Sequence, residues 1–431
     1  MSAPATTARV APARRCAYTV LRRVFEDGAY ADRALRGEAK ELDARDRALA
    51  MRLAYGAVQR KGTLDFLIER LAERPAARLD ARLLAALRLG LYELLYLGGA
   101  PDHAVVADGV ELAKGGARGG HGLVNAVLRR GAREGRALLA DLGDETPERA
   151  AVKHSHPEWI ARLWWDQLGA SDARALMAYD NEPGEVALRA NTLLTDAATL
   201  AGELPVPTHT DPDLPEALVL EGPFDAHDSP AWGAGAFLAQ SRAAMGVARV
   251  LGPRPGELVL DLCAAPGGKS THLAALMDGE GEVVAVERNA RRAGMLARTA
   301  QRLHATNVRV EVADAAEERP EGAVFDRVLV DPPCSGLGTL QARADLRWRV
   351  TPEDVRAMVL TQASILAAGA GAVRPGGVLV YSTCTISPTE NELQIAAFLH
   401  ANRDFGRDEL MTTLPHRDHT AGFFIARLRR S

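Results

Sequence analysis

Two cysteines lie in short segments that suit nucleophilic chemistry. Cys334 belongs to the segment Asp331-Pro-Pro-Cys-Ser-Gly, and Cys384 belongs to Ser382-Thr-Cys-Thr. The chain has four cysteines and no Cys-x-x-Cys pair, so neither a disulfide framework nor a zinc site is expected. An important cysteine here therefore acts as a thiol, whose thiolate form is the nucleophile.

A glycine-containing segment forms a second candidate site. Asp261-Leu-Cys-Ala-Ala-Pro-Gly-Gly-Lys-Ser follows one predicted strand, and Gly267 and Gly268 in it allow close approach of a ligand to the backbone. The next helix directs free N–H groups at a carboxylate or phosphate. Glu287 ends the following strand, where an acid can accept hydrogen bonds from both ribose hydroxyls. A nucleoside ligand is predicted; the loop matches neither Gly-x-Gly-x-x-Gly nor a Walker loop, which disfavours NAD and ATP.

Short apolar runs after residue 232 predict the strands that position these segments. They are residues 257–262, 282–287, 308–312, 325–330, 377–382 and 423–428. The first four are nearly continuous apolar runs, as in strands covered by helices on both faces, and residues 291–303 show helical spacing. The fold class is therefore α/β with a doubly wound, Rossmann-like sheet. Ligands bind beyond the carboxyl ends of such strands, so both thiols should face the crevice that holds the nucleoside ligand.

The earlier part of the chain has a different pattern. Residues 12–136 show apolar stripes at helical spacing and no strand pattern. An acidic segment beginning at Asp141 resembles a linker, and Pro157 opens a further helix. Residues 196–228 hold eight acids, no Lys or Arg and several prolines, which predicts a small connecting α+β subdomain. We therefore expect an all-helical domain at 1–140, a linker and connecting subdomain at 141–231, and the α/β domain at 232–431.

The charge of the chain is uneven. Residues 1–140 carry 24 basic and 16 acidic residues, a net charge of +8, while residues 141–431 carry −12. A basic first third favours a polyanionic partner, although an Arg-rich solvated helical surface would give the same count.

These motifs resemble known families. The cysteine segments and the glycine loop are similar to those of S-adenosylmethionine-dependent RNA cytosine-C5 methyltransferases. Residues 53–60, 87–94 and 122–129 (LAYGAVQR, LRLGLYEL and GLVNAVLR) resemble the helical RNA-binding domain of the NusB type. The combination resembles the bacterial small-subunit (16S) ribosomal RNA methyltransferases of the RsmB or Sun family, over nearly the whole chain.

The resemblance implies a covalent mechanism with S-adenosylmethionine as the cofactor. Cys384 would be the nucleophile that adds to C6 of cytosine, and Cys334 would assist release of the adduct. Asp331 would contact the N3 or N4 edge of cytosine and would also border the cofactor. The resemblance further assigns the methionine part of the cofactor to Cys263, Ala264, Ala265, Pro266, Gly267, Gly268 and Lys269, the ribose to Glu287 and the adenine edge to Asp314.

The chain departs from the family pattern at two positions. Ala344 precedes Asp345 where the family has a Pro-Asp pair, and Ala421 stands where the family has Asp before Gly-Phe-Phe. If that aspartate contacts substrate, Asp418 or a neighbouring chain must compensate.

Other functions stay open. One is methylation of transfer RNA at cytosine C5, and another is a non-catalytic, antitermination-like RNA-binding factor. An amino-group methyltransferase is disfavoured because Cys334 stands where those enzymes place an aromatic residue after Asp-Pro-Pro. Residues 1–10 do not resemble a signal peptide, and no apolar run approaches the length of a membrane helix. We expect a monomeric cytoplasmic protein with ribosomal RNA as partner, no membrane and no metal.

Overall fold

A computed structural model describes residues 10–114, 116, 119–319 and 322–431. The chain forms two compact units. The helical unit comprises residues 1–182 and 340–349, and the sheet unit comprises residues 183–339 and 350–431. Residues 1–9, for which the sequence predicts no signal peptide, lie outside the described part. The domain boundaries at residues 140 and 231 stay a prediction.

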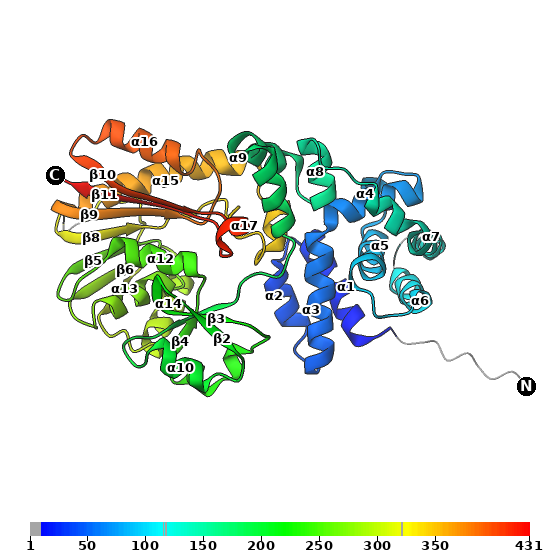
Figure 1. Cartoon of the computed structure of the whole chain (residues 1–431), viewed down its shortest axis with the longest axis horizontal. Helices are drawn as coiled ribbons and strands as arrows, with labels where there is room; N and C mark the ends of the chain where they lie inside the picture. The colour runs from blue at the N-terminus through cyan, green and yellow to red at the C-terminus, as the bar shows by residue number, and fades with distance from the viewer. Residues whose placement is uncertain (1–9, 115, 117–118, 320–321) are drawn as a thin grey trace, which may run out of the picture. The chain divides into compact units, whose positions relative to one another are not determined.

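The helical unit is built from amphipathic helices, and no strand occurs among its described residues. The apolar stripe of α1 is buried in one core with the facing sides of α3, α4 and α5. Asp43 caps α3 and Asp80 caps α5, each through its side-chain oxygen. The helices, coloured blue to green in Figure 1, are α1 (Pro12–Phe25), α2 (Ala31–Glu38), α3 (Ala44–Gln59), α4 (Lys61–Ala72), α5 (Ala81–Tyr92), α6 (Asp102–Ala113), α7 (Gly120–Ala140), α8 (Pro147–His154) and α9 (Glu158–Tyr179).

Residues 340–349 are distant in sequence from the rest of the helical unit. Ala344 is buried in its apolar core, and Trp348 Nε1 donates a hydrogen bond to the Val58 carbonyl (2.8 Å). The fully buried Arg347 donates to the carbonyls of Ser155 and Asp180, both at 3.1 Å. These contacts explain why the segment belongs to this unit although it follows the Cys334 loop in the chain.

The sheet unit begins with a small antiparallel sheet of order β2-β3-β1-β4. Its apolar face packs around Leu188, Leu200, Leu218 and Phe237. The elements are β1 (Ala187–Ala190), α10 (Ala197–Glu203), β2 (Thr208–Asp211), β3 (Leu214–Leu220), α11 (Pro230–Gly233) and β4 (Phe237–Ala239). The sequence predicts a connecting α+β subdomain within residues 141–231; in the structure this sheet belongs to the same compact unit as the large sheet, and β4 lies beyond residue 231.

The large sheet has the order β10-β11-β9-β8-β5-β6-β7; β5 to β9 are parallel, and β11 pairs antiparallel with both β9 and β10. All six strands predicted after residue 232 are present. The strands are β5 (Leu258–Leu262), β6 (Glu282–Val286), β7 (Val308–Glu311), β8 (Phe325–Val330), β9 (Val373–Thr383), β10 (Phe405–Thr413) and β11 (Phe423–Arg430). The sequence missed β10 because it is an edge strand whose residues after Phe405 are mostly exposed, so it lacks an apolar pattern.

Two apolar cores cover the two faces of this sheet. Alternate strand residues point to opposite faces, so Leu260 and Leu262 join one core while Val259 joins the other. The helices α15 (Pro352–Ala372) and α16 (Glu392–Ala401) cover the first face. The helices α12 (Arg242–Leu251) and α13 (Gly268–Leu276) cover the second, and α14 (Ala290–Arg302) packs beside α13 (Figure 1). The predicted doubly wound fold is confirmed.

One described helix, α15, is long and apolar enough to cross a membrane by length and composition alone. Its Ile365, Leu366 and Ala370 belong to the apolar core against β8 and β9. Part of α15 is thus buried against the sheet, and the sequence, inspected for an unbroken apolar run, did not single out this helix.

Candidate active site

The strand order brings all the predicted site segments to one edge of the large sheet. β8, β5, β6 and β7 are neighbouring parallel strands, and β9 pairs with β8. The glycine loop follows β5, Glu287 follows β6 and Asp314 follows β7. The two cysteine loops follow β8 and β9. The carboxyl ends of these strands thus place both candidate sites side by side.

The glycine loop connects β5 to α13 in a conformation that favours glycine. Gly267 caps α13 with φ of 102°, and a Cβ atom there would lie 3.2 Å from Leu296 Cγ. Asp261, at the end of β5, is buried and accepts a hydrogen bond from Ser270 Oγ (2.6 Å). Burial raises its pKa to about 7. Its other oxygen, Oδ1, has no hydrogen-bond partner among the described residues.

Two further acids follow the next strands. The Glu287 carboxylate is buried, accepts a hydrogen bond from the Asn289 backbone (2.9 Å) and lies 3.4 Å from Arg292. Asp314 is exposed and accepts a hydrogen bond from the Ala316 backbone (3.0 Å). Both acids thus follow strands at the same edge of the sheet, and their roles toward the cofactor stay a prediction.

The two predicted thiols are in direct contact. Cys334 Sγ lies 3.4 Å from Cys384 Sγ, and both residues are half-buried. The hydrogen bond with Cys384, together with burial, raises the pKa of Cys334 well above its usual value. Of the other cysteines, Cys16 lies in the helical unit and Cys263 in the glycine loop; burial raises the pKa of Cys16 to about 11 and that of Cys263 to about 12. Two thiols at this distance can act on the same atom of a substrate.

Asp331 links the two candidate sites. Its Oδ2 accepts from Lys269 Nζ (2.6 Å), and its Oδ1 accepts from Ser382 Oγ (2.8 Å). Burial alone would lower the pKa of Lys269, but the Asp331 carboxylate outweighs burial, and the net shift is upward. Lys269, which the resemblance assigns to the cofactor, thus directs its ammonium to the loop that carries Cys334. The sequence did not identify a cation near the thiols, and Lys269 occupies that place in the structure.

A family model of the 16S rRNA methyltransferases RsmB/F matches residues 248–429, and the NusB family model matches residues 11–133. A probable ribosomal RNA small subunit methyltransferase B from Synechocystis sp. is 37% identical over 97% of this chain and 99% of its own length. The chain belongs to the RsmB/F family. A probable member from Bacillus subtilis is 34% identical over 97% of this chain and 98% of its own length. The solved structure of PH0851 is 27% identical, with a TM-score of 0.83 over 98% of this chain and 99% of that chain.

This member of the RsmB/F family is an S-adenosylmethionine-dependent RNA methyltransferase. The residues at the sheet edge suit that cofactor. The unpartnered Oδ1 of Asp261 is an acceptor for an ammonium group, the first turn of α13 offers free N–H groups, and Glu287 offers a carboxylate to the ribose. Sequence reasoning gave no role to Asp261, although an acid at the end of the first strand, ahead of the glycines, was a visible signal.

The structure shows the contacts at the two positions where the chain departs from the family pattern. Ala344 is buried in the helical unit, and the following Asp345 pairs with Arg349 (2.7 Å). The Ala421 carbonyl accepts a hydrogen bond from Thr413 Oγ1 (2.7 Å). Asp418 accepts from the Leu414 backbone (2.6 Å) within its own turn, so its carboxylate already has a structural partner.

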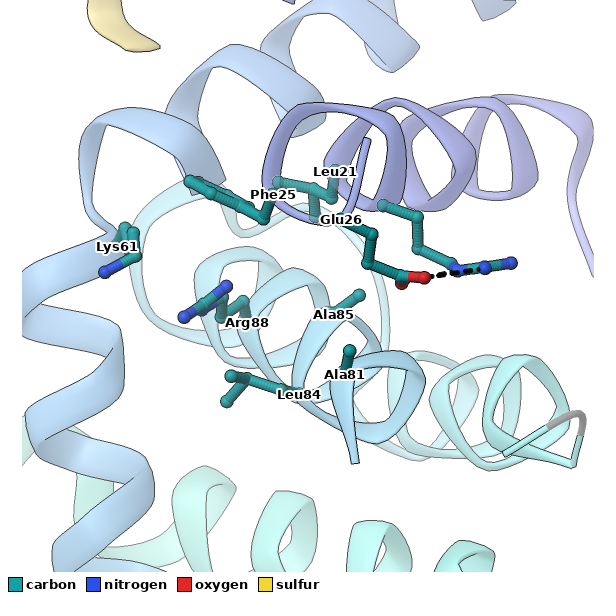
Figure 2. Close-up of a pocket in the computed structure, with 9 residues that line it drawn as sticks. Leu21, Phe25, Glu26, Lys61, Ala81, Leu84, Ala85 and Arg88 are labelled. Atoms are coloured by element: carbon teal, nitrogen blue, oxygen red, sulfur yellow. Dashed lines mark hydrogen bonds and ion pairs between the residues drawn. The ribbon is translucent and has the colours of Figure 1, made fainter. Parts of the chain in front are cut away.

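The NusB-like part of this family member contains a pocket of about 210 Å³ between α1 and α5. Figure 2 shows Phe25 and Leu84 on its apolar walls, with Lys61 and Arg88 at its rim. Asp65 lies 3.2 Å from Lys61 and accepts two hydrogen bonds from Arg88 (2.7 and 2.9 Å). These two cations share one carboxylate, so their charge is only partly neutralised at the rim of the pocket.

Proposed function

We propose that this enzyme methylates C5 of a cytidine in 16S ribosomal RNA through a covalent adduct between Cys384 and C6. The single observation that carries the proposal is the 3.4 Å contact between Cys384 and Cys334, with Asp331 and Lys269 beside them. The names of the relatives, which are small-subunit ribosomal RNA methyltransferases, support the substrate. That substrate also favours a cytoplasmic location.

The chemistry explains why a thiol is needed. C5 of cytosine is a poor nucleophile, so the Cys384 thiolate first adds to C6 and turns C5 into an enamine carbon. S-adenosylmethionine, when bound, supplies the electrophilic methyl group. A base then takes the C5 proton, the electron pair of that C–H bond re-forms the C5–C6 double bond, and the S–C6 bond breaks, so Cys384 leaves as a thiolate. Cys334, in contact with Cys384, is the group that we assign to this release step.

The charged residues beside the thiols have complementary roles. Asp331 holds the N3 or N4 edge of the base, where charge develops as the thiol adds. The Lys269 ammonium stabilises the Cys384 thiolate, with which it interacts electrostatically. The cofactor is held by the segment from Cys263 to Lys269, with Glu287 on the ribose and Asp314 on the adenine edge.

The basic helical unit supports RNA as the substrate, because its first 140 residues carry a net charge of +8. Transfer RNA is the alternative substrate for the same chemistry. A non-catalytic RNA-binding factor is disfavoured, because a binding protein has no use for two thiols in contact beside a cofactor crevice.

The test is to map 5-methylcytosine by bisulfite sequencing in total RNA from a deletion strain, the wild type and a strain complemented with Cys384→Ala. We expect one 16S position to lose methylation in the deletion strain and to stay unmethylated with the variant. Loss confined to transfer RNA would assign the alternative substrate. Unchanged methylation everywhere would refute the proposed reaction.

A further inference from the structure

Glu390 is a buried acid outside the residues assigned above. Its side chain is fully buried in the loop between β9 and α16. Oε1 accepts hydrogen bonds from the Ser335 backbone N–H (2.8 Å) and Gln362 Nε2 (3.0 Å), and Oε2 accepts from Ser335 Oγ (2.6 Å). Within the described ranges no Lys, Arg or His forms an ion pair with it. A carboxylate is the side chain that accepts on both oxygens, so these three donors explain an acid here.

The donors to Glu390 surround Cys334 in the chain. Ser335 directly follows Cys334 and is held through both its backbone and its hydroxyl group. Gln362, on α15, also donates to the carbonyl of Pro333 (3.0 Å), which directly precedes Cys334. Glu390 therefore fixes the residues on both sides of this thiol, one directly and one through Gln362.

The next residue, Asn391, does the same for the other thiol. Its Oδ1 accepts from Thr383 Oγ1 (2.6 Å), and its Nδ2 donates to the Thr385 carbonyl (2.9 Å). Thr383 and Thr385 are the two neighbours of Cys384 in the chain. Glu390 and Asn391 thus both form hydrogen bonds with the cysteine loops.

A direct bridge joins the two loops. Ser335 Oγ lies 2.5 Å from Thr385 Oγ1, so one hydroxyl contacts both Glu390 and the loop of Cys384. Tyr381, which ends the pairing of β9 with β8, donates its hydroxyl proton to the Glu390 carbonyl (2.7 Å). The bridge, the carboxylate and the strand belong to one buried network that joins the two cysteine loops.

We propose that Glu390 is a positioning residue for methyl transfer: it fixes the Cys334 loop against the Cys384 loop and so keeps the two thiols in contact. The inference rests on the proposed function, in which Cys334 opens the adduct that Cys384 forms. Misplacing a reacting group by about 1 Å can reduce a rate by up to about 10²-fold. A carboxylate that touches neither base nor cofactor can therefore set the rate of adduct release.

The first test measures thiol contact without using activity. Full-length wild type, Glu390→Gln and Glu392→Gln are treated with diamide, which takes one hydrogen from each thiol and is reduced to its hydrazine as the disulfide forms. Peptide mapping follows the Cys334–Cys384 disulfide over time. Glutamine offers an N–H₂ group where the donors need an acceptor, so Glu390→Gln should form the disulfide about 10-fold more slowly. Glu392, the exposed acid two residues on, is the matched control and should match wild type. A wild-type or faster rate in Glu390→Gln would overturn the proposal.

The second test measures the catalytic consequence. Glu390→Gln should lower kcat by about 10- to 100-fold, leave the affinity for S-adenosylmethionine unchanged, and accumulate a denaturation-resistant protein–RNA adduct as Cys334→Ala does. Unchanged kcat, or a loss that only follows weaker cofactor binding, would overturn the positioning role. Ser335→Ala keeps the backbone donor but removes the bridge to Thr385, so it should give a smaller loss and serves if Glu390→Gln does not fold. If wild type forms neither adduct nor 5-methylcytosine, the proposed function fails. The rates of disulfide formation still test whether Glu390 keeps the two thiols in contact.

Discussion

The ammonium of Lys269 lies 2.6 Å from Oδ2 of Asp331. The same carboxylate accepts from Ser382 Oγ through Oδ1 (2.8 Å). Asp331 thus joins the glycine loop to both cysteine loops with one side chain. The arrangement places a cation of the cofactor segment beside the cysteine loops.

Lys269→Met should lower kcat by about 10²- to 10³-fold, because the ammonium that stabilises the thiolate is lost. The affinity for S-adenosylmethionine, measured by calorimetry, should change little, since the ammonium points to Asp331. Lys40→Met, at an exposed position, is the control. A parallel loss of cofactor affinity would show that the Lys269 ammonium, and not only the backbone of its segment, contacts the cofactor.

The two thiols should behave differently when each is removed. Cys384→Ala should lose methyl transfer and form no covalent RNA complex. Cys334→Ala should still add to C6 and transfer the methyl group, but it should accumulate the adduct because release is slow. Denaturing gel mobility of labelled RNA distinguishes these outcomes. An adduct in Cys384→Ala and none in Cys334→Ala would make Cys334 the nucleophile.

Glu287→Ala should weaken S-adenosylmethionine binding by about 10- to 100-fold, as expected from the loss of hydrogen bonds between a carboxylate and the ribose. Calorimetric titration of the full chain measures the effect. Glu280→Ala removes an exposed acid from the turn before β6 and should bind as wild type does. Equal affinities in all three proteins would remove Glu287 from the cofactor site.

Asp261 should make stability depend on pH. Its pKa of about 7 in the folded state exceeds the unfolded value of 3.8, so the folded state holds the proton more tightly. Stability conferred by this carboxyl is full below pH 3.8 and falls by about 1.4 kcal/mol per pH unit up to about pH 7. Asp261→Asn cannot ionise at this position, so its free energy of unfolding relative to that of wild type should rise by up to about 4 kcal/mol between pH 4 and pH 7. Urea unfolding at several pH values checks this, and a stability difference independent of pH would contradict it.

RNA affinity should depend on salt through the helical unit. Each lost phosphate contact lowers the slope of log affinity against log salt by about 0.7 for single-stranded RNA, so removing three should lower it by about 2. Filter binding compares two triple alanine variants at exposed positions: Arg36, Arg45 and Arg52 in the helical unit, and Arg254, Arg356 and Arg407 in the sheet unit. Equal slopes for the two variants would show that the charge asymmetry is only a surface feature.

The sequence by itself determined the class of fold and the main chemical groups. Strand periodicity located six of the seven strands of the large sheet, and the segments around Gly267, Cys334 and Cys384 indicated a cofactor loop and two thiols. These features are local, since apolar spacing and turn residues depend on neighbours in the chain. The strand-end rule then placed both thiols at one crevice.

Only the tertiary structure decided which of these groups touch. Three contacts join residues that are 50 to 62 positions apart in the chain: the 3.4 Å contact between the thiols, the ion pair of Lys269 with Asp331 and the hydrogen bond from Ser335 to Glu390. Such pairings depend on strand order and register, which no local pattern encodes. The placement of residues 340–349 in the helical unit escaped the sequence for a similar reason, because it depends on contacts of the buried Arg347 with distant carbonyls. The edge strand β10 was missed for a different reason, since its mostly exposed residues give no apolar pattern.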